Sequence, residues 1–143
     1  MREQAFWDSS AIVPVCLQQR SSSFARQLLR QFRIVAWWAT SIETRSALAR
    51  ELRSGTISRT EHGEAVLRME KLRQDWVEVA PDDALRSFAE ELPDRFSLRA
   101  ADALQLAAAY TWTMQRPDGR PFISGDKRLL EAAAQLGFRA ITV

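Results

Sequence analysis

The run Ile34–Gly55, IVAWWATSIETRSALARELRSG, places a continuous apolar segment directly before a helix-forming one. Ile34–Ala39 is apolar at every position, which is typical of a strand buried on both faces of a parallel sheet. Thr40 or Ser41 then supplies a helix start, and Gly55 supplies a helix stop. A strand followed at once by a helix is the repeating unit of an α/β fold.

The chain repeats this alternation on both sides of that run. Besides Ile34–Ala39, strands are predicted at Ala5–Trp7, Trp76–Ala80, residues 122–126 and residues 139–143. Helices are predicted at residues 9–17, Ser22–Phe32, residues 40–53, Ser58–Gln74, Asp82–Glu91, Leu98–Trp112 and residues 127–138. Pro93 is the predicted stop of the Asp82–Glu91 helix, and Gly137 lies near the end of the last helix. Arg116–Pro121 is predicted as a turn. This order predicts an α/β fold with a mainly parallel sheet.

Length and composition indicate an ordinary globular chain. With 143 residues and no repeat or linker, we expect one domain over residues 1–143 that buries about two-thirds of its unfolded surface. There is no apolar run long enough to span a bilayer, and the single cysteine, Cys16, excludes an internal disulfide. Cys16 lies among apolar residues and is expected to pack in the core. His62 lacks nearby His or Cys partners and is a poor metal ligand.

The charge of the chain permits a nucleic-acid partner without demanding one. The formal net charge is only +2, but all of the 20 basic residues except Lys71 and Lys127 are arginine. The planar fork of arginine suits phosphate recognition. A GC-rich genome would produce the same bias and is the simpler explanation.

One carboxylate stands in an otherwise apolar helix. Asp102 lies in the segment LRAADALQLAAAYTW (Leu98–Trp112), where it shares a face with Leu98 and Leu106. An uncompensated carboxylate in such surroundings is costly. Arg99, three residues earlier, offers an i, i+3 ion pair as the plain explanation. A role in binding a ligand is the alternative.

Three further acids stand at the ends of predicted strands. Asp8 follows the first strand, Glu43 lies at the start of the helix after the second, and Asp126 follows residues 122–124. Each has a structural explanation: Asp8 could cap the first helix, and Asp126 or Ser124 could cap the last. Thr40-Ser41-Ile42-Glu43 matches a capping box, in which the glutamate bonds back to the N-cap amide.

Taken together, the four acids favour a shared site. In an open parallel sheet, ligands bind beyond the carboxyl ends of the strands. If the three strands are neighbours, Asp8, Glu43 and Asp126 meet at one edge, and Asp102 would point to the same place. Mg²⁺ takes oxygen ligands of this type, and such ions can activate a water for attack on a phosphodiester.

The chain resembles the PIN-domain ribonucleases, in particular the VapC toxins of bacterial toxin–antitoxin pairs. The resemblance covers almost the whole chain and is carried by four blocks in order: FWDSSAIV, SIETRSALARELRSG, LRAADALQLAAA and FISGDKRLLEAAAQLGF. It implies a three-layer PIN-like fold with a central parallel sheet. It also implies that Asp8, Glu43, Asp102 and Asp126 form an acidic metal site, with Ser124 as a supporting hydrogen-bonding group.

The function that the resemblance implies is a Mg²⁺- or Mn²⁺-dependent endoribonuclease of the cytoplasm. Asp8, Asp102 and Asp126 would bind the metal directly or through water, and Glu43 would ligate it or orient the attacking water. Arg99 and Arg128 are candidates for gripping phosphates, although a plain surface role is the simpler interpretation of both. The substrate would be a loop in a structured RNA, since sequence-specific readers need unpaired bases. A cognate VapB-type antitoxin and a homodimer are the expected partners.

Two features depart from the family pattern, and two rival functions need separate consideration. Trp7 precedes the first aspartate where a smaller residue is commoner, and the 116–121 turn lengthens the connection from Asp102 to Asp126.

A catalytically inactive PIN-like module that binds RNA or protein would be free to lose any of the four acids. A phospho-acceptor receiver domain would carry adjacent acids after its first strand, where this chain has Ser9 and Ser10. Of the five tryptophans, Trp76 or Trp112 is the one expected at an interface if any is exposed.

Overall fold

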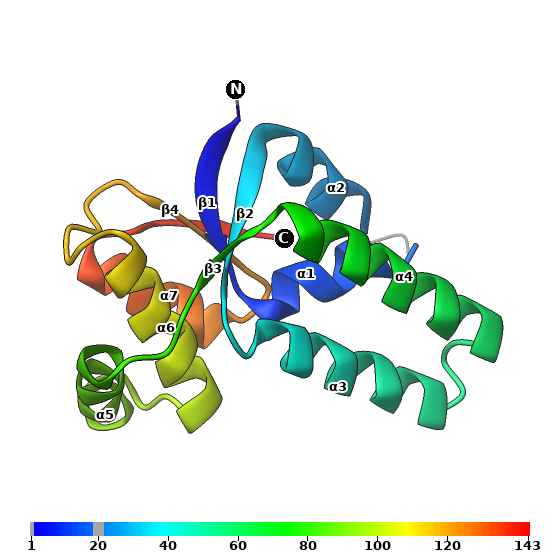
Figure 1. Ribbon diagram of the computed structural model, residues 1–143. Coiled ribbons are helices and arrows are strands. Elements are labelled where there is room, and N and C mark those ends of the chain that lie inside the picture. The colour runs from blue at the N-terminus through cyan, green and yellow to red at the C-terminus, as the bar shows by residue number, and fades with distance from the viewer. Residues whose placement is uncertain (1, 19–21) are drawn as a thin grey trace.

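A parallel sheet organises the chain, and the computed structural model describes residues 2–18 and 22–143 of it. In this part, five strands pair in the order β3-β2-β1-β4-β5, every pair parallel (Figure 1). The strands are β1 (Glu3–Trp7), β2 (Phe32–Trp37), β3 (Val77–Val79), β4 (Pro121–Ser124) and β5 (Arg139–Thr142). The predicted α/β class is therefore confirmed.

Seven helices, counted over the same residues, connect the strands. They are α1 (Ser9–Cys16), α2 (Ser22–Gln31), α3 (Thr40–Arg53), α4 (Arg59–Asp75), α5 (Asp83–Phe96), α6 (Ala100–Trp112) and α7 (Lys127–Leu136). Figure 1 shows α1–α4 on one side of the sheet and α5–α7 on the other. The three-layer arrangement that the resemblance implies is present.

Alternation along the strands creates two cores. Successive side chains of a strand point to opposite faces, so Trp7 and Ile123 pack under α1–α4, whereas Phe6 and Phe122 pack under α5–α7. Phe6 and Phe122 stack with ring centroids 5.4 Å apart. The central strands are thus buried on both faces, as their apolar runs predict.

The strand order places a switch point beside β1. Its neighbours are β2, which follows in the chain, and β4, which comes about a hundred residues later. All five strands run in the same direction, so their carboxyl ends share one edge of the sheet. The crevice between the ends of β1 and β4 is where such a sheet binds ligands.

Two predicted boundaries around β2 were wrong. Phe32 begins the strand rather than ending the preceding helix, because it pairs with Glu3 of β1. The strand ends at Trp37 rather than at residue 39. Ala39 already has helical backbone angles and stands at the N-cap of α3.

The predicted stop at Pro93 was also wrong. Helix α5 continues through Pro93 to Phe96 and ends at Ser97, whose φ of 55° is left-handed. Proline removes one backbone donor, but burial of Leu92 and Leu98 against the second core holds the last turn in place. By contrast, Gly137 ends α7 in the left-handed conformation, as predicted.

Two expectations from composition are met. Cys16 is buried, and burial raises the pKa of its thiol to about 12, so it is a packed and unreactive side chain. In the described residues, no helix has the length and apolarity needed to cross a membrane.

Candidate functional site

Asp8 occupies the switch point between β1 and β4. It directly follows β1, and its backbone N–H donates to the carbonyl of Ile123 in β4 at 3.0 Å. The Ser124 hydroxyl, at the end of β4, donates to the Asp8 carboxylate at 2.9 Å. Asp8 is 3% exposed, so this carboxylate is held inside the crevice by the sheet itself.

Hydroxyl groups surround the Asp8 carboxylate. Asp8 is the N-cap residue of α1, but its side chain makes no N-cap hydrogen bond. Instead Ser10 and Ser124 donate to one carboxylate oxygen, and Ser9 approaches the other at 3.5 Å. Burial raises the pKa of Asp8, and the hydrogen bonds from Ser10 and Ser124 oppose that shift. Neutral donors thus supply part of the compensation that no ion pair provides.

Glu43 lies in the first turn of α3 and faces α1 and α6. The predicted capping box is wrong, because Ala39 is the N-cap residue and no side chain caps the helix. The Glu43 carboxylate instead accepts hydrogen bonds from Ser9 Oγ at 3.0 Å and from Gln105 Nε2 at 3.2 Å. Its pKa is raised, mainly by burial and further by the charges of Asp8 and Asp102.

Gln105 holds Glu43 from the core side. It is fully buried on α6, and its Nε2 also donates to the Thr40 hydroxyl at 3.1 Å. Its Oε1 is buried without a hydrogen-bond partner. A buried amide with one unsatisfied oxygen is costly, so packing alone does not explain a glutamine at this position.

Asp102 lacks the ion pair that would explain it. Four ion pairs form among the described residues, and neither Asp102 nor Arg99 takes part in any of them. The pKa of Asp102 is raised to about 6, first by burial and then by the charges of Asp126 and Asp8. The charges of Arg99 and Arg128 oppose this shift but do not cancel it. The i, i+3 ion pair was therefore the wrong explanation.

Asp126 both caps α7 and lies beside the other acids. Its carboxylate accepts the Leu129 N–H at 3.1 Å and so caps α7, as the capping explanation predicts. Its own N–H donates to Ser124 Oγ at 2.9 Å, which links it to Asp8 through one hydroxyl. Asp126 and Asp102 line one shallow depression of about 350 Å³.

The charges of the acids affect one another, but their carboxylates are not arranged to coordinate a common metal ion. In the described part of the chain, no three His, Cys, Asp or Glu side chains lie close enough together to hold a metal ion as they stand. The reason is visible in their contacts, because Asp8 is tied to serine hydroxyls and Asp126 is turned to cap α7. These side chains would have to change their contacts before three of the carboxylates could share one ion.

Cations gather on one side of the acids. Arg99, Lys127 and Arg128 line the same depression as Asp102 and Asp126. Arg99 is the N-cap of α6, and Lys127 and Arg128 open α7. The helix dipole disfavours cations at these positions by a few tenths of a kcal/mol each. Their placement suits an anion bound from solution better than it suits helix stability.

An apolar groove lies on the other side. It has a volume of about 600 Å³ between α1 and α3, and Ser9, Ser10 and Glu43 form its wall toward the acids.

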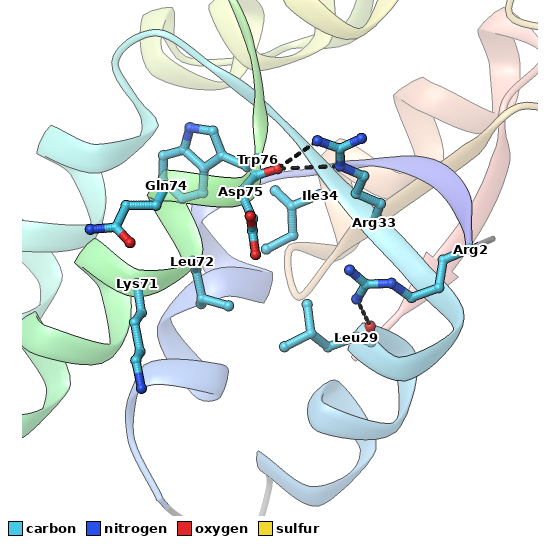
Figure 2. Close-up of a pocket in the computed structure, with 9 residues that line it drawn as sticks. All are labelled: Arg2, Leu29, Arg33, Ile34, Lys71, Leu72, Gln74, Asp75 and Trp76. Atoms are coloured by element: carbon cyan, nitrogen blue, oxygen red, sulfur yellow. Dashed lines mark hydrogen bonds between the residues drawn. The ribbon is translucent and has the colours of Figure 1, made fainter.

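Another hollow, of about 400 Å³, lies at the opposite edge of the sheet near the amino ends of the strands (Figure 2). There Arg33 donates to the Asp75 carbonyl at the end of α4, and Arg2 donates to the Leu29 carbonyl near the end of α2. Both arginines thus satisfy helix carbonyls.

Sequence reasoning missed several polar residues of this site. Ser9, Ser10, Thr40 and Gln105 all bond to the acids or to each other. The signal was present for Gln105, since it lies one helical turn after Asp102 in a segment that is otherwise almost wholly apolar. Of the two tryptophans expected at an interface, Trp76 is buried and Trp112 is half-buried. Trp38, which was not expected there, is 50% exposed at the carboxyl end of β2, the edge that carries the acids.

Comparison with known proteins supports the fold. No family model matches the chain, and no curated protein matches it significantly. Among solved structures, PAE2754 from Pyrobaculum aerophilum superposes with a TM-score of 0.67 at 17% identity, over 100% of this chain and 91% of that one. A toxin-antitoxin complex from Klebsiella pneumoniae gives a TM-score of 0.59 at 15% identity, over 86% and 87% of the two chains. At these identities the likeness shows the fold alone, which is consistent with a PIN-like fold.

Proposed function

We propose that this chain is a metal-dependent endoribonuclease that acts as the toxin of a toxin–antitoxin pair. The observation that carries the proposal is Asp102, a half-buried carboxylate with no ion pair, whose pKa is raised by burial and by Asp126 and Asp8. A fold does not retain such a cluster for stability, because every pair of its charges repels. A bound cation would remove that penalty.

The donor set fits Mg²⁺ or Mn²⁺. Asp8, Glu43, Asp102 and Asp126 offer only carboxylate oxygens, which hard divalent cations prefer. Asp8, Asp102 and Asp126 would hold the ion directly or through water. The ion, once bound, would lower the pKa of a bound water and stabilise charge on the phosphate.

The other residues of the site would orient these acids and the substrate. Ser124 and Ser10 fix the Asp8 carboxylate at the ends of β4 and β1. Glu43, which accepts hydrogen bonds from Ser9 and Gln105, would accept a proton from the attacking water or orient it. Arg99 and Arg128 would contact phosphates of the RNA from the N-termini of α6 and α7.

The partners follow from the same charges. A structural neighbour is described as a toxin-antitoxin complex from Klebsiella pneumoniae. We extend that association to this chain: a VapB-type antitoxin would place a basic side chain among the four acids. A homodimer acting in the cytoplasm completes the proposal.

The test is cleavage of RNA by the purified protein. Total cellular RNA incubated with Mg²⁺ or Mn²⁺ should acquire new 5′ ends at defined sites, and excess EDTA should abolish them. Asp8→Asn and Asp102→Asn should each lose most of the activity while they keep the circular dichroism spectrum of the wild type. Full cleavage in EDTA, or wild-type rates from both variants, would remove the metal-nuclease proposal in favour of a binding module.

A further inference from the structure

The groove beside the acids differs from the acidic site in being mostly apolar. We call it the α1–α3 groove and define it by Val13 and Pro14 of α1 and Ile42, Ala47 and Arg50 of α3, with Ser9 on the wall toward the acids. Its surface is mostly apolar, and Ile42 is 62% exposed there. An aliphatic side chain so exposed beside a charged site gains contacts only when something covers it.

Arg50 supplies a cation at the far wall of this groove. Its Nη1 donates only to the hydroxyl of Ser46, at 3.3 Å. No carboxylate of the described residues lies within ion-pair distance of it. The remaining donors of its guanidinium are therefore free to meet a phosphate or to stack on a planar ring.

The groove is continuous with the acidic site. Ser9 lines it and contacts the carboxylates of both Asp8 and Glu43. Across the acids lies the depression that carries Arg99, Lys127 and Arg128. The site therefore has two unlike sides, one cationic and one apolar with a single free arginine.

We propose that the α1–α3 groove binds an unpaired nucleobase of the RNA, immediately next to the phosphate held at the acids. The proposal rests on the proposed function and adds to it the location of one base of the strand. An RNA strand alternates charged phosphates with flat apolar rings, and proteins read its bases after splaying them out of the stack. The cationic side suits the continuing phosphates, and the apolar side suits the extruded base.

Size and charge favour this occupant over a peptide. A volume of about 600 Å³ lies within the range of small-molecule sites and can accept a nucleoside. Ser9 on the near wall donates its hydroxyl proton to Glu43 and can still accept a hydrogen bond from the edge of a base, while Arg50 remains for the following phosphate. An antitoxin segment in the groove is the rival that the experiment must separate.

The experiment compares two variants of α3 on a random-sequence single-stranded RNA pool whose cleavage products are sequenced. Ala47→Phe fills the groove, and Arg50→Ala removes its cation. Wild type should show a base preference at one position beside the cut. Each variant should weaken that preference by roughly tenfold, the discrimination of a single pocket contact. The matched control is Arg53→Ala, because Arg53 is an exposed arginine near the end of the same helix and does not line the groove.

A second measurement does not depend on turnover. RNA carrying 4-thiouridine, irradiated with the inactive Asp102→Asn protein, should crosslink to peptides of α1 and α3. If wild type cuts the pool but both variants keep its base preference, the subsite is wrong while the nuclease stands. If wild type cuts neither the pool nor total RNA, both proposals fail. Variants that keep the preference but escape a co-expressed antitoxin would assign the groove to the protein partner.

Discussion

Asp102 is the residue at which the energetic cost of the acidic cluster is clearest. Its carboxylate is half-buried, has no ion pair, and is repelled by Asp126 and Asp8. The three charges are tolerated because Ser10 and Ser124 stabilise Asp8 with neutral hydrogen bonds, and because Arg99 and Arg128 provide positive charge in the same depression. The acids are therefore expected to be least stable together at high pH in the absence of divalent cations.

We expect Asp102→Asn to stabilise the metal-free protein by about 1 kcal/mol at pH 8, after the raised pKa is discounted for solvent screening. The pKa of Asp102 in the folded state, about 6, lies above its ordinary value of 3.8. Its ionisation is therefore unfavourable to folding above pH 6. The penalty fades as pH falls from 6 to 4, so the advantage of the variant should shrink over that window. Urea unfolding in EDTA at several pH values measures it.

Mg²⁺ should reverse the order of stability of wild type and Asp102→Asn. Because the ion binds only the folded site, it should raise the Tm of wild type and raise that of Asp102→Asn less. An ordinary surface carboxylate would leave both melts insensitive to Mg²⁺. A destabilised variant combined with a metal-insensitive wild type would remove Asp102 from the site.

Gln105 is expected to affect activity more than stability. Gln105→Met keeps the volume but removes the donor to Glu43, and it also removes the unsatisfied Oε1. The lost hydrogen bonds and the lost penalty oppose each other, so the free energy of unfolding should change by less than about 1 kcal/mol. RNA cleavage should fall by about tenfold because Glu43 keeps only the hydrogen bond from Ser9. Thr40→Val, which removes only the other acceptor, is the matched control. If the two variants lose equal activity, Gln105 does not act through Glu43.

At the scale of elements, the sequence was informative where local chemistry decides and misleading where packing decides. The apolar runs at β1, β2 and β4 and the left-handed Gly137 follow from side-chain patterns alone. Pro93 did not end α5, because burial of Leu92 and Leu98 on either side of the last turn outweighs one lost backbone bond. Glu43 did not form the capping box that its spacing suggests. Two donors from other elements, Ser9 and Gln105, hold its carboxylate instead.

Helix α4 carries the capping box that α3 lacks. Ser58 Oγ accepts the Glu61 N–H at 3.1 Å, and the Glu61 carboxylate accepts the Ser58 N–H at 2.9 Å. Ser58→Ala should therefore lower the free energy of unfolding by about 1 kcal/mol. Thr60→Ala, at an exposed position of the same first turn that makes no cap bond, should have little effect. Equal effects of the two substitutions in urea titrations would show that the cap contributes no stability beyond helix propensity.

At the scale of the whole molecule, the fold brings four acids from four separate segments to one edge of the parallel sheet. Sequence order alone could not place Asp8 beside Ser124, because their contact depends on β4 returning next to β1. The strand order supplies that contact. The same edge carries the half-exposed Trp38 and the exposed Ile42, so two of the exposed apolar side chains gather beside the four acids at the carboxyl ends of the strands.

That concentration leads to a prediction for the complex with an antitoxin. Expression of wild type alone should arrest growth, and co-expression of a small antitoxin encoded beside the gene should relieve the arrest. Asp8→Asn and Asp102→Asn should not arrest growth.

A basic antitoxin residue among the acids would remove their mutual repulsion, so binding should be weaker to Asp102→Asn than to wild type in the absence of metal. Mg²⁺ should compete with the antitoxin for wild type, because both occupy the same carboxylates. Titration calorimetry of the two proteins with and without Mg²⁺ measures this. An antitoxin that binds both proteins equally and ignores Mg²⁺ would neutralise the toxin away from the acids, and its basic residue would have to act elsewhere.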